Sequence, residues 1–162
     1  MALAQHEHEG LGVEPVRFQA GVAGRLGDHM RDPVRLPGNI QGFNLETGER
    51  LWSSQVIGEG KVPSIVIGDG LGFTAGGWGG KETIKAFKLG GSGELRETNL
   101  VWEQRKGMPK VPSMLYVKPH LFAITDGGIA TCADAKTGHV HWTQRLNGKF
   151  SASPVAAEGK IY

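Results

Sequence analysis

Two histidines that lie two positions apart, His139 and His141, are the first candidates for chemistry in this sequence. On a β-strand, side chains at positions i and i+2 point to the same face, as paired zinc ligands sometimes do. An earlier segment of similar sequence carries Glu49 and Leu51 at the equivalent positions, and no third ligand is implied. We therefore expect an ordinary strand face and assign no metal site.

Cys132 is the second candidate, as a nucleophile. A single cysteine excludes an internal disulfide and any site built from several cysteines. Cys132 occupies the small-residue position at which Gly42 stands in the earlier segment. Because free cysteines are among the most buried residues, we expect Cys132 to pack inside the protein.

The glycine run Gly76–Lys81 is similar to a phosphate-binding loop, with two departures. Ala75 stands where the first glycine belongs, and Glu82 replaces the serine or threonine that would hold magnesium. We expect a turn between strands. In the N-terminal His6-Glu7-His8 sequence, adventitious metal binding is all that we expect. With no Ser/His/Asp arrangement and no paired carboxylates, we assign no catalytic residue.

Composition narrows the class of protein. The 162 residues include 26 glycines without a strict period, which indicates many tight turns. The 18 basic and 16 acidic residues give a net charge of +2, so nothing favours binding to nucleic acid. No apolar stretch is long enough for a membrane span, and the first residues do not form a secretory signal.

His139 and His141 lie within a sequence repeat, and Cys132 lies just before it. Thr47-Gly48-Glu49-Arg50-Leu51-Trp52 returns ninety residues later as Thr137-Gly138-His139-Val140-His141-Trp142, and Trp102 lies between the two. Each tryptophan is followed 10 to 12 residues later by a proline beside a serine, at Pro63-Ser64, Pro112-Ser113 and Ser153-Pro154. Self-similarity at 40 to 50 residues, in strand-sized pieces, is typical of propeller blades.

The repeat predicts strands joined by short turns. One unit has strands at 62–67, 71–75, 83–89 and 99–104, with a longer loop at 90–94, and the next has them at 113–117, 121–125, 129–133 and 140–145. A further unit begins at Ser151 and stops at Tyr162. Asp69-Gly70 and Glu158-Gly159 are among the expected turns, and Asp-Gly supplies the positive φ that hairpin turns need.

We therefore expect an all-β fold, a partial β-propeller of four-stranded antiparallel blades, with about two full blades plus parts of two others. Residues 1–40 form a poorly defined segment that could belong to a preceding blade. Residues 41–162 are propeller repeats truncated within a blade. A propeller needs several blades to close its ring, so we expect a fragment whose partners include the missing blades.

The segment from Cys132 to Trp142 resembles the repeat A-x-D-x-x-T-G-x-x-x-W of pyrroloquinoline-quinone (PQQ)-like propellers. The segment from Gly42 to Trp52 fits this repeat with asparagine in place of aspartate, whereas the middle copy differs from the repeat in the residues before Trp102. Within that superfamily the sequence is similar to BamB-like repeat proteins of the outer-membrane-protein assembly lipoprotein type. The resemblance covers roughly residues 41–162.

The repeat residues are expected to build blades. Asn44 and Asp134 can accept hydrogen bonds from turn amides, the glycines permit positive φ, and the tryptophans pack between blades. The structural motif comprises Asn44, Thr47, Gly48, Trp52, Trp102, Asp134, Thr137, Gly138 and Trp142. None of these roles is catalytic.

The resemblance implies a mostly extracytoplasmic family, periplasmic or associated with the outer membrane, whose members often act as protein-binding scaffolds. We therefore expect a non-catalytic scaffold with protein partners and no cofactor. The alternative is a fragment of a PQQ-dependent quinoprotein oxidoreductase, with PQQ and Ca²⁺ held outside this chain. A repeat region of a larger signalling protein is a third reading.

Overall fold

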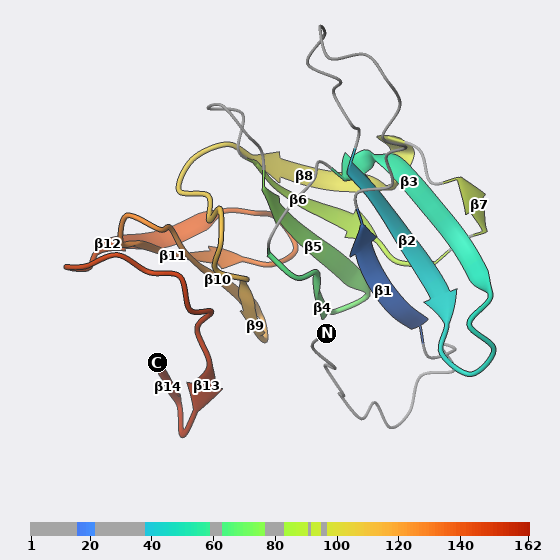
Figure 1. Cartoon of the computed structure of the whole chain (residues 1–162). Coiled ribbons are helices and arrows are strands. Elements are labelled where there is room, and N and C mark those ends of the chain that lie inside the picture. The colour runs from blue at the N-terminus through green and yellow to red at the C-terminus, as the bar shows by residue number, and fades with distance from the viewer. Residues whose placement is uncertain (1–15, 22–37, 59–62, 77–82, 91, 95–96) are drawn as a thin grey trace, which may run out of the picture.

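The structure, a computed structural model, describes residues 16–21, 38–58, 63–76, 83–90, 92–94 and 97–162. These residues form β-strands, turns and one short 3₁₀ helix at Glu97–Asn99. No helix of the described residues is long and apolar enough to cross a bilayer. The strands make three four-stranded sheets and one hairpin, and the sheets stand side by side in chain order (Figure 1).

The first sheet contains β1 (Val16–Gly21), β2 (Gly38–Asn44), β3 (Arg50–Gly58) and β7 (Gly93–Glu94), in that order. β1 and β2 are antiparallel, as are β2 and β3, with a register shift beside Gly42. β1 thus lies within the N-terminal segment that the sequence left poorly defined.

The second and third sheets repeat one topology. The second contains β4 (Val66–Gly68), β5 (Leu71–Gly76), β6 (Thr83–Lys88) and β8 (Leu100–Gln104). The third contains β9 (Leu115–Val117), β10 (His120–Ile124), β11 (Ile129–Asp134) and β12 (Val140–Arg145). Both are antiparallel in the order first to fourth strand. The chain then forms a hairpin of β13 (Ala156–Ala157) and β14 (Lys160–Ile161).

Local sequence explains the hairpins. Asp69 and Gly70, between β4 and β5, have φ of 50° and 74°. Glu158 and Gly159, between β13 and β14, have φ of 52° and 72°. Two successive residues with positive φ give the tight hairpin turn whose twist matches that of its strands. Both turns lie where the sequence predicted them.

The core lies between sheets. Phe73 and Ala86 of the second sheet are fully buried in one cluster with Leu121 and Ala123 of the third. A smaller cluster joins Ile40 and Trp52 of the first sheet to Phe87 of the second. Each sheet therefore buries a face against its neighbour, as blades of a propeller do.

The expected all-β partial propeller is confirmed, with local differences. The strands predicted at 62–67 and 113–117 begin later than expected, at Val66 and Leu115. The predicted loop at 90–94 contains β7, which pairs with β3 in parallel, through Trp52 opposite Gly93. β3 is the last long strand of its sheet, so its outer edge offers backbone groups for pairing. Gly93 has φ of 76°, which glycine adopts without strain, and the loop can therefore turn onto that edge.

Candidate functional site

The two matching turns of the repeat have the same hydrogen bonds. Asn44 Oδ1 accepts from the N–H groups of Glu46 and Thr47, both at 2.9 Å. Asp134 Oδ1 accepts from the N–H of Lys136 at 3.0 Å and of Thr137 at 2.8 Å. In each turn, the side-chain oxygen thus accepts hydrogen bonds from two backbone N–H groups that have no partner on a neighbouring strand.

Threonine completes each turn. Thr47 Oγ1 accepts from the N–H of Glu49, and Thr137 Oγ1 accepts from that of His139, both at 3.2 Å. Thr137 also donates its hydroxyl proton to Asp134 Oδ1 at 2.8 Å. These bonds from Thr137 favour the charged carboxylate and hold the pKa of Asp134 below its usual value.

Trp102 joins the second sheet to the third. Its indole N–H donates to the carbonyl of Ala135 at 3.0 Å, across the gap between sheets. Gly138, with φ of 73°, lies so close that a Cβ there would come 2.8 Å from Trp102 Cδ2. The turn of the third sheet is therefore shaped to receive the tryptophan of the second.

The other two motif tryptophans differ in burial. Trp52 is 2% exposed and meets Phe87 of the second sheet edge to face, with 6.2 Å between ring centroids. Trp142, in contrast, is 45% exposed and has Phe122 of its own sheet 6.1 Å away. The structure thus places two tryptophans between sheets and leaves the third on an open face.

The residue opposite each tryptophan is small. Gly42 pairs with Trp52, Ala86 with Trp102, and Cys132 with Trp142. Cys132 is 3% exposed, and burial raises the pKa of its thiol. A buried thiol with a raised pKa is a poor nucleophile, in keeping with the expected packing role.

A charged cluster at one edge was missed by the sequence reading. Lys118 Nζ lies 3.0 Å from Asp69 Oδ1, and Lys136 Nζ lies 3.9 Å from Oδ2. The hydrogen bond from Lys118 is the main cause that lowers the pKa of Asp69. Asp69 belongs to the β4–β5 turn and both lysines to the third sheet, so the cluster joins two sheets.

Tyr116 lies beneath this cluster. Its ring stacks on Phe73, with centroids 6.1 Å apart and planes 16° from parallel, and a Cβ at Gly68 would overlap it. The hydroxyl is buried and no hydrogen bond of good geometry reaches it from the described residues. Burial, together with the nearby Asp69 carboxylate, raises the pKa of Tyr116 to about 12. The repeat pattern does not indicate the contacts of Asp69 and Tyr116, because the residues that contact each other belong to different repeat units.

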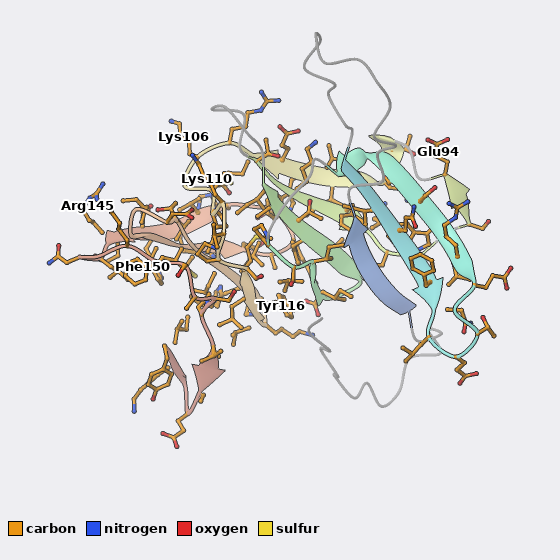
Figure 2. The ribbon with its side chains drawn as sticks, viewed as in Figure 1. Glu94, Lys106, Lys110, Tyr116, Arg145 and Phe150 are labelled. Atoms are coloured by element: carbon orange, nitrogen blue, oxygen red, sulfur yellow. The ribbon has the colours of Figure 1, made fainter. Side chains whose placement is uncertain are left out.

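Exposed basic residues lie at the end of β12 and in the loops that follow β8 and β12, here called the cationic edge: Arg105, Lys106, Lys110, Arg145 and Lys149. Asp126 fixes two of its loops, because its Oδ2 accepts from the N–H of Lys110 at 2.9 Å and its carbonyl accepts from Phe150 at 3.1 Å. In Figure 2, Lys106, Lys110 and Arg145 reach outward on the same side of the molecule. Arg105 also forms an ion pair with Glu103 at 2.8 Å.

The two predicted histidines meet a third at the edge of the third sheet. Ring centroids of His120 and His141 are 5.2 Å apart, and those of His139 and His141 are 5.8 Å apart. His120 lies at the start of β10 and had no signal in the sequence. Among the described residues, no group of three or more His, Cys, Asp or Glu side chains is placed to hold one metal ion. His139 and His141 are exposed.

Two candidate segments that the sequence suggested lie wholly or mostly outside the described residues. The His6-Glu7-His8 sequence lies outside the described residues. Gly76 ends β5, Thr83 begins β6, and Gly77–Lys81 between them lie outside as well.

Comparison with known proteins places these features in a family. A family model described as "Outer membrane protein assembly factor BamB", of the PQQ_2 type, matches residues 36–162. Among curated proteins, no sequence matches this chain.

Two solved structures share the fold. BamB from Moraxella catarrhalis is 12% identical, with a TM-score of 0.58 over 77% of this chain and 34% of that one. A europium-containing methanol dehydrogenase is also 12% identical, with a TM-score of 0.50 over 69% of this chain and 22% of that one. This chain therefore spans about a third of the length of that BamB. Because the family model matches most of its residues, the chain belongs to the BamB family of PQQ-repeat β-propeller proteins.

Proposed function

We propose that this chain is part of a non-catalytic propeller scaffold that binds other proteins, and that the cationic edge is its contact surface for an acidic partner. The proposal has one main support. The repeated polar residues are engaged in turns or between sheets, whereas the basic residues of the cationic edge are exposed at the surface. A scaffold whose motif residues build its frame must bind through residues that do not repeat.

Charge and rigidity make this edge suitable for binding. Among the described residues of the loops that form this edge, five are basic and two, Glu103 and Asp126, are acidic. Hydrogen bonds hold the loops, since Leu146 N–H donates to the Gly128 carbonyl at 2.7 Å, in addition to the two bonds to Asp126. Fixed loops lose little conformational entropy on binding, and concentrated charge speeds encounter with a partner of opposite sign.

The alternative is a fragment of a quinoprotein oxidoreductase that uses PQQ with Ca²⁺. The methanol dehydrogenase shares the fold at 12% identity, which is a likeness of architecture only. In the described part of the chain, no cluster of carboxylates or histidines fits a metal ion. We propose that these residues bind no cofactor.

Family membership also bears on location. The description of the matching family names an outer-membrane-protein assembly factor. We propose accordingly that the scaffold works outside the cytoplasm, in the periplasm or at the outer membrane, with proteins as its partners.

Charge reversal tests the contact surface. The tagged chain would be cross-linked in envelope extracts of its source, and a recovered protein would then be titrated by calorimetry. In the Lys106→Glu/Arg145→Glu variant we expect affinity to fall about tenfold or more, because two attractive charges become repulsive. Binding of the unmodified chain should also weaken as salt rises.

A matched control keeps the net charge the same. Lys88→Glu/Lys160→Glu reverses two exposed lysines at the opposite edge, one at the end of β6 and one in β14. Equal losses in both variants would refute the cationic edge as the contact surface. A saturable PQQ spectrum with Ca²⁺, accompanied by alcohol or sugar oxidation in the full-length protein, would instead support the quinoprotein alternative.

A further inference from the structure

A serine beside a proline precedes the first strand of three successive units. Ser64 lies ahead of β4, Ser113 ahead of β9, and Ser153 ahead of β13. The recurrence is visible in the sequence, yet the turns and tryptophan contacts described above do not account for it.

These serines are hydrogen-bonded to one another. The N–H of Ser64 donates to Ser113 Oγ at 2.8 Å, although 49 residues separate them. The N–H of Ser113 donates in turn to Ser153 Oγ at 2.9 Å, over 40 residues. Each bond crosses from one unit to the next, so Ser113 acts at once as acceptor and donor.

The hydroxyl is the part of the motif that is maintained. Proline precedes serine in Pro63-Ser64 and Pro112-Ser113, but follows it in Ser153-Pro154. The unit lengths also differ, as the spacings of 49 and 40 residues show. Because the same bond forms in spite of both differences, the position of the hydroxyl is what the interface requires.

The series has an open end. Within the described part of the chain, the N–H of Ser153 donates to no acceptor, and Ser153 is exposed. Exposed apolar side chains surround this end of the chain, with Val155 59%, Ile161 42% and Tyr162 64% exposed. The open face thus continues the two interfaces that are already formed.

We propose that Ser64, Ser113 and Ser153 are links of one hydrogen-bonded series between units, and that the open Ser153 N–H docks a further repeat through a serine or threonine hydroxyl. The occupant is defined by its chemistry. It must present a hydroxyl as acceptor ahead of its first strand, as Ser113 and Ser153 do, together with an apolar face.

Amide exchange tests the links that are present. In the full chain, Ser113→Ala removes the acceptor of Ser64, and Ser153→Ala removes that of Ser113. We expect the Ser64 and Ser113 amides, respectively, to exchange about two- to tenfold faster, as the loss of one such bond implies. The readout is hydrogen–deuterium exchange resolved by NMR.

Two further variants separate a lost bond from general loosening. Ser113→Thr keeps a hydroxyl and should leave exchange at Ser64 near its original rate. Ser151→Ala, at an exposed serine outside the series, should change neither amide. The links are refuted if Ser64 exchanges equally fast in the unmodified chain and in Ser113→Ala, or if all amides speed up together.

An added repeat tests the open end. Tyr162 corresponds to Phe122 when Ser153 is aligned with Ser113, so a copy of residues 123–162 joined after Tyr162 continues the unit in register. The copy brings its own serine at the position of Ser153. We expect the Ser153 amide to exchange about two- to tenfold more slowly than when that copied serine is changed to alanine. Equal rates, or a Trp142 that stays as exposed to solvent as before, would overturn the docking proposal.

Discussion

Asn44 and Asp134 perform the same task with different chemistry. Each accepts hydrogen bonds from the amides two and three residues ahead, and Asp134 is also charged and accepts a hydrogen bond from the hydroxyl of Thr137. The turn therefore depends on an oxygen at that position, which both side chains supply. The surroundings of the two turns differ more, because among the described residues Trp102 packs against the turn at Asp134, whereas none lies within 4 Å of a Cβ placed at Gly48.

The two turn glycines should differ in their tolerance of a side chain. Gly48 and Gly138 have nearly equal φ, 71° and 73°, but a Cβ would meet nothing within 4 Å at Gly48 and Trp102 at Gly138. Gly48→Ala should cost about 1–2 kcal/mol of unfolding free energy from backbone strain. Gly138→Ala should cost about 1–3 kcal/mol more from overpacking. Urea unfolding measures both, and equal losses would contradict the close fit.

The tryptophans offer a second comparison. Trp102→Phe removes the donor to the Ala135 carbonyl, so the free energy of unfolding should fall by about 1–3 kcal/mol. Trp142→Phe changes an exposed side chain and should shift stability by about 0.5 kcal/mol or less. Urea titration followed by circular dichroism suits both variants, since neither removes strand content. If Trp142→Phe were the more damaging change, the assignment of Trp102 as the inter-sheet tie would be wrong.

At the scale of elements, the interface between the second and third sheets is held by a turn as well as by a tryptophan. The β4–β5 turn places Asp69 against Lys118 and Lys136, and Gly68 at the end of β4 lies against the ring of Tyr116. Because Asp69 and Tyr116 influence each other's pKa, the interface should respond to pH.

Alkaline pH should weaken this interface. The pKa of Tyr116 is about 12 in the folded protein, against 10.0 for an ordinary tyrosine. Below pH 10 both states keep the proton and the contribution is intact. Between about pH 10 and 12 the unfolded state loses its proton while the folded state retains it, so the free energy of unfolding falls. Unfolding in urea across this range should show the decline.

Tyr116→Phe supplies the control for that measurement, because it keeps the ring and removes the ionisable group. Its unfolding free energy should fall less steeply over the same interval. Parallel slopes for the two proteins would assign the alkaline loss to other groups.

Strands and turns could be predicted from the sequence because they follow from local rules. Asp69-Gly70 and Glu158-Gly159 have the positive φ that their residue types indicate, and the second and third sheets form from the predicted segments. The β7 strand could not be predicted, since two residues carry no period. The contacts of His120, Asp69 and Tyr116 were missed for another reason. Their contacts are set by how sheets pack, and residues from separate strands or units meet without a common spacing.

At the scale of the whole molecule, the third sheet and the last hairpin have an uncovered side. Trp142, Val155, Ile161 and Tyr162 of these elements and the segments beside them are exposed, whereas the equivalent Trp52 is buried against the second sheet. The chain covers about a third of the BamB structure that shares its fold. An apolar face of this kind favours association.

The 162-residue chain on its own should therefore self-associate as its concentration rises. Sedimentation velocity over a range of concentrations should show an increasing sedimentation coefficient, because the apolar side chains gain by leaving water. Trp142→Lys/Ile161→Lys should shift the equilibrium toward monomer, while Val101→Lys, at an exposed position on β8 of the second sheet, should not. A compact monomer at all concentrations, with one cooperative unfolding transition, would mean that three sheets and a hairpin are sufficient and that the open face needs no cover.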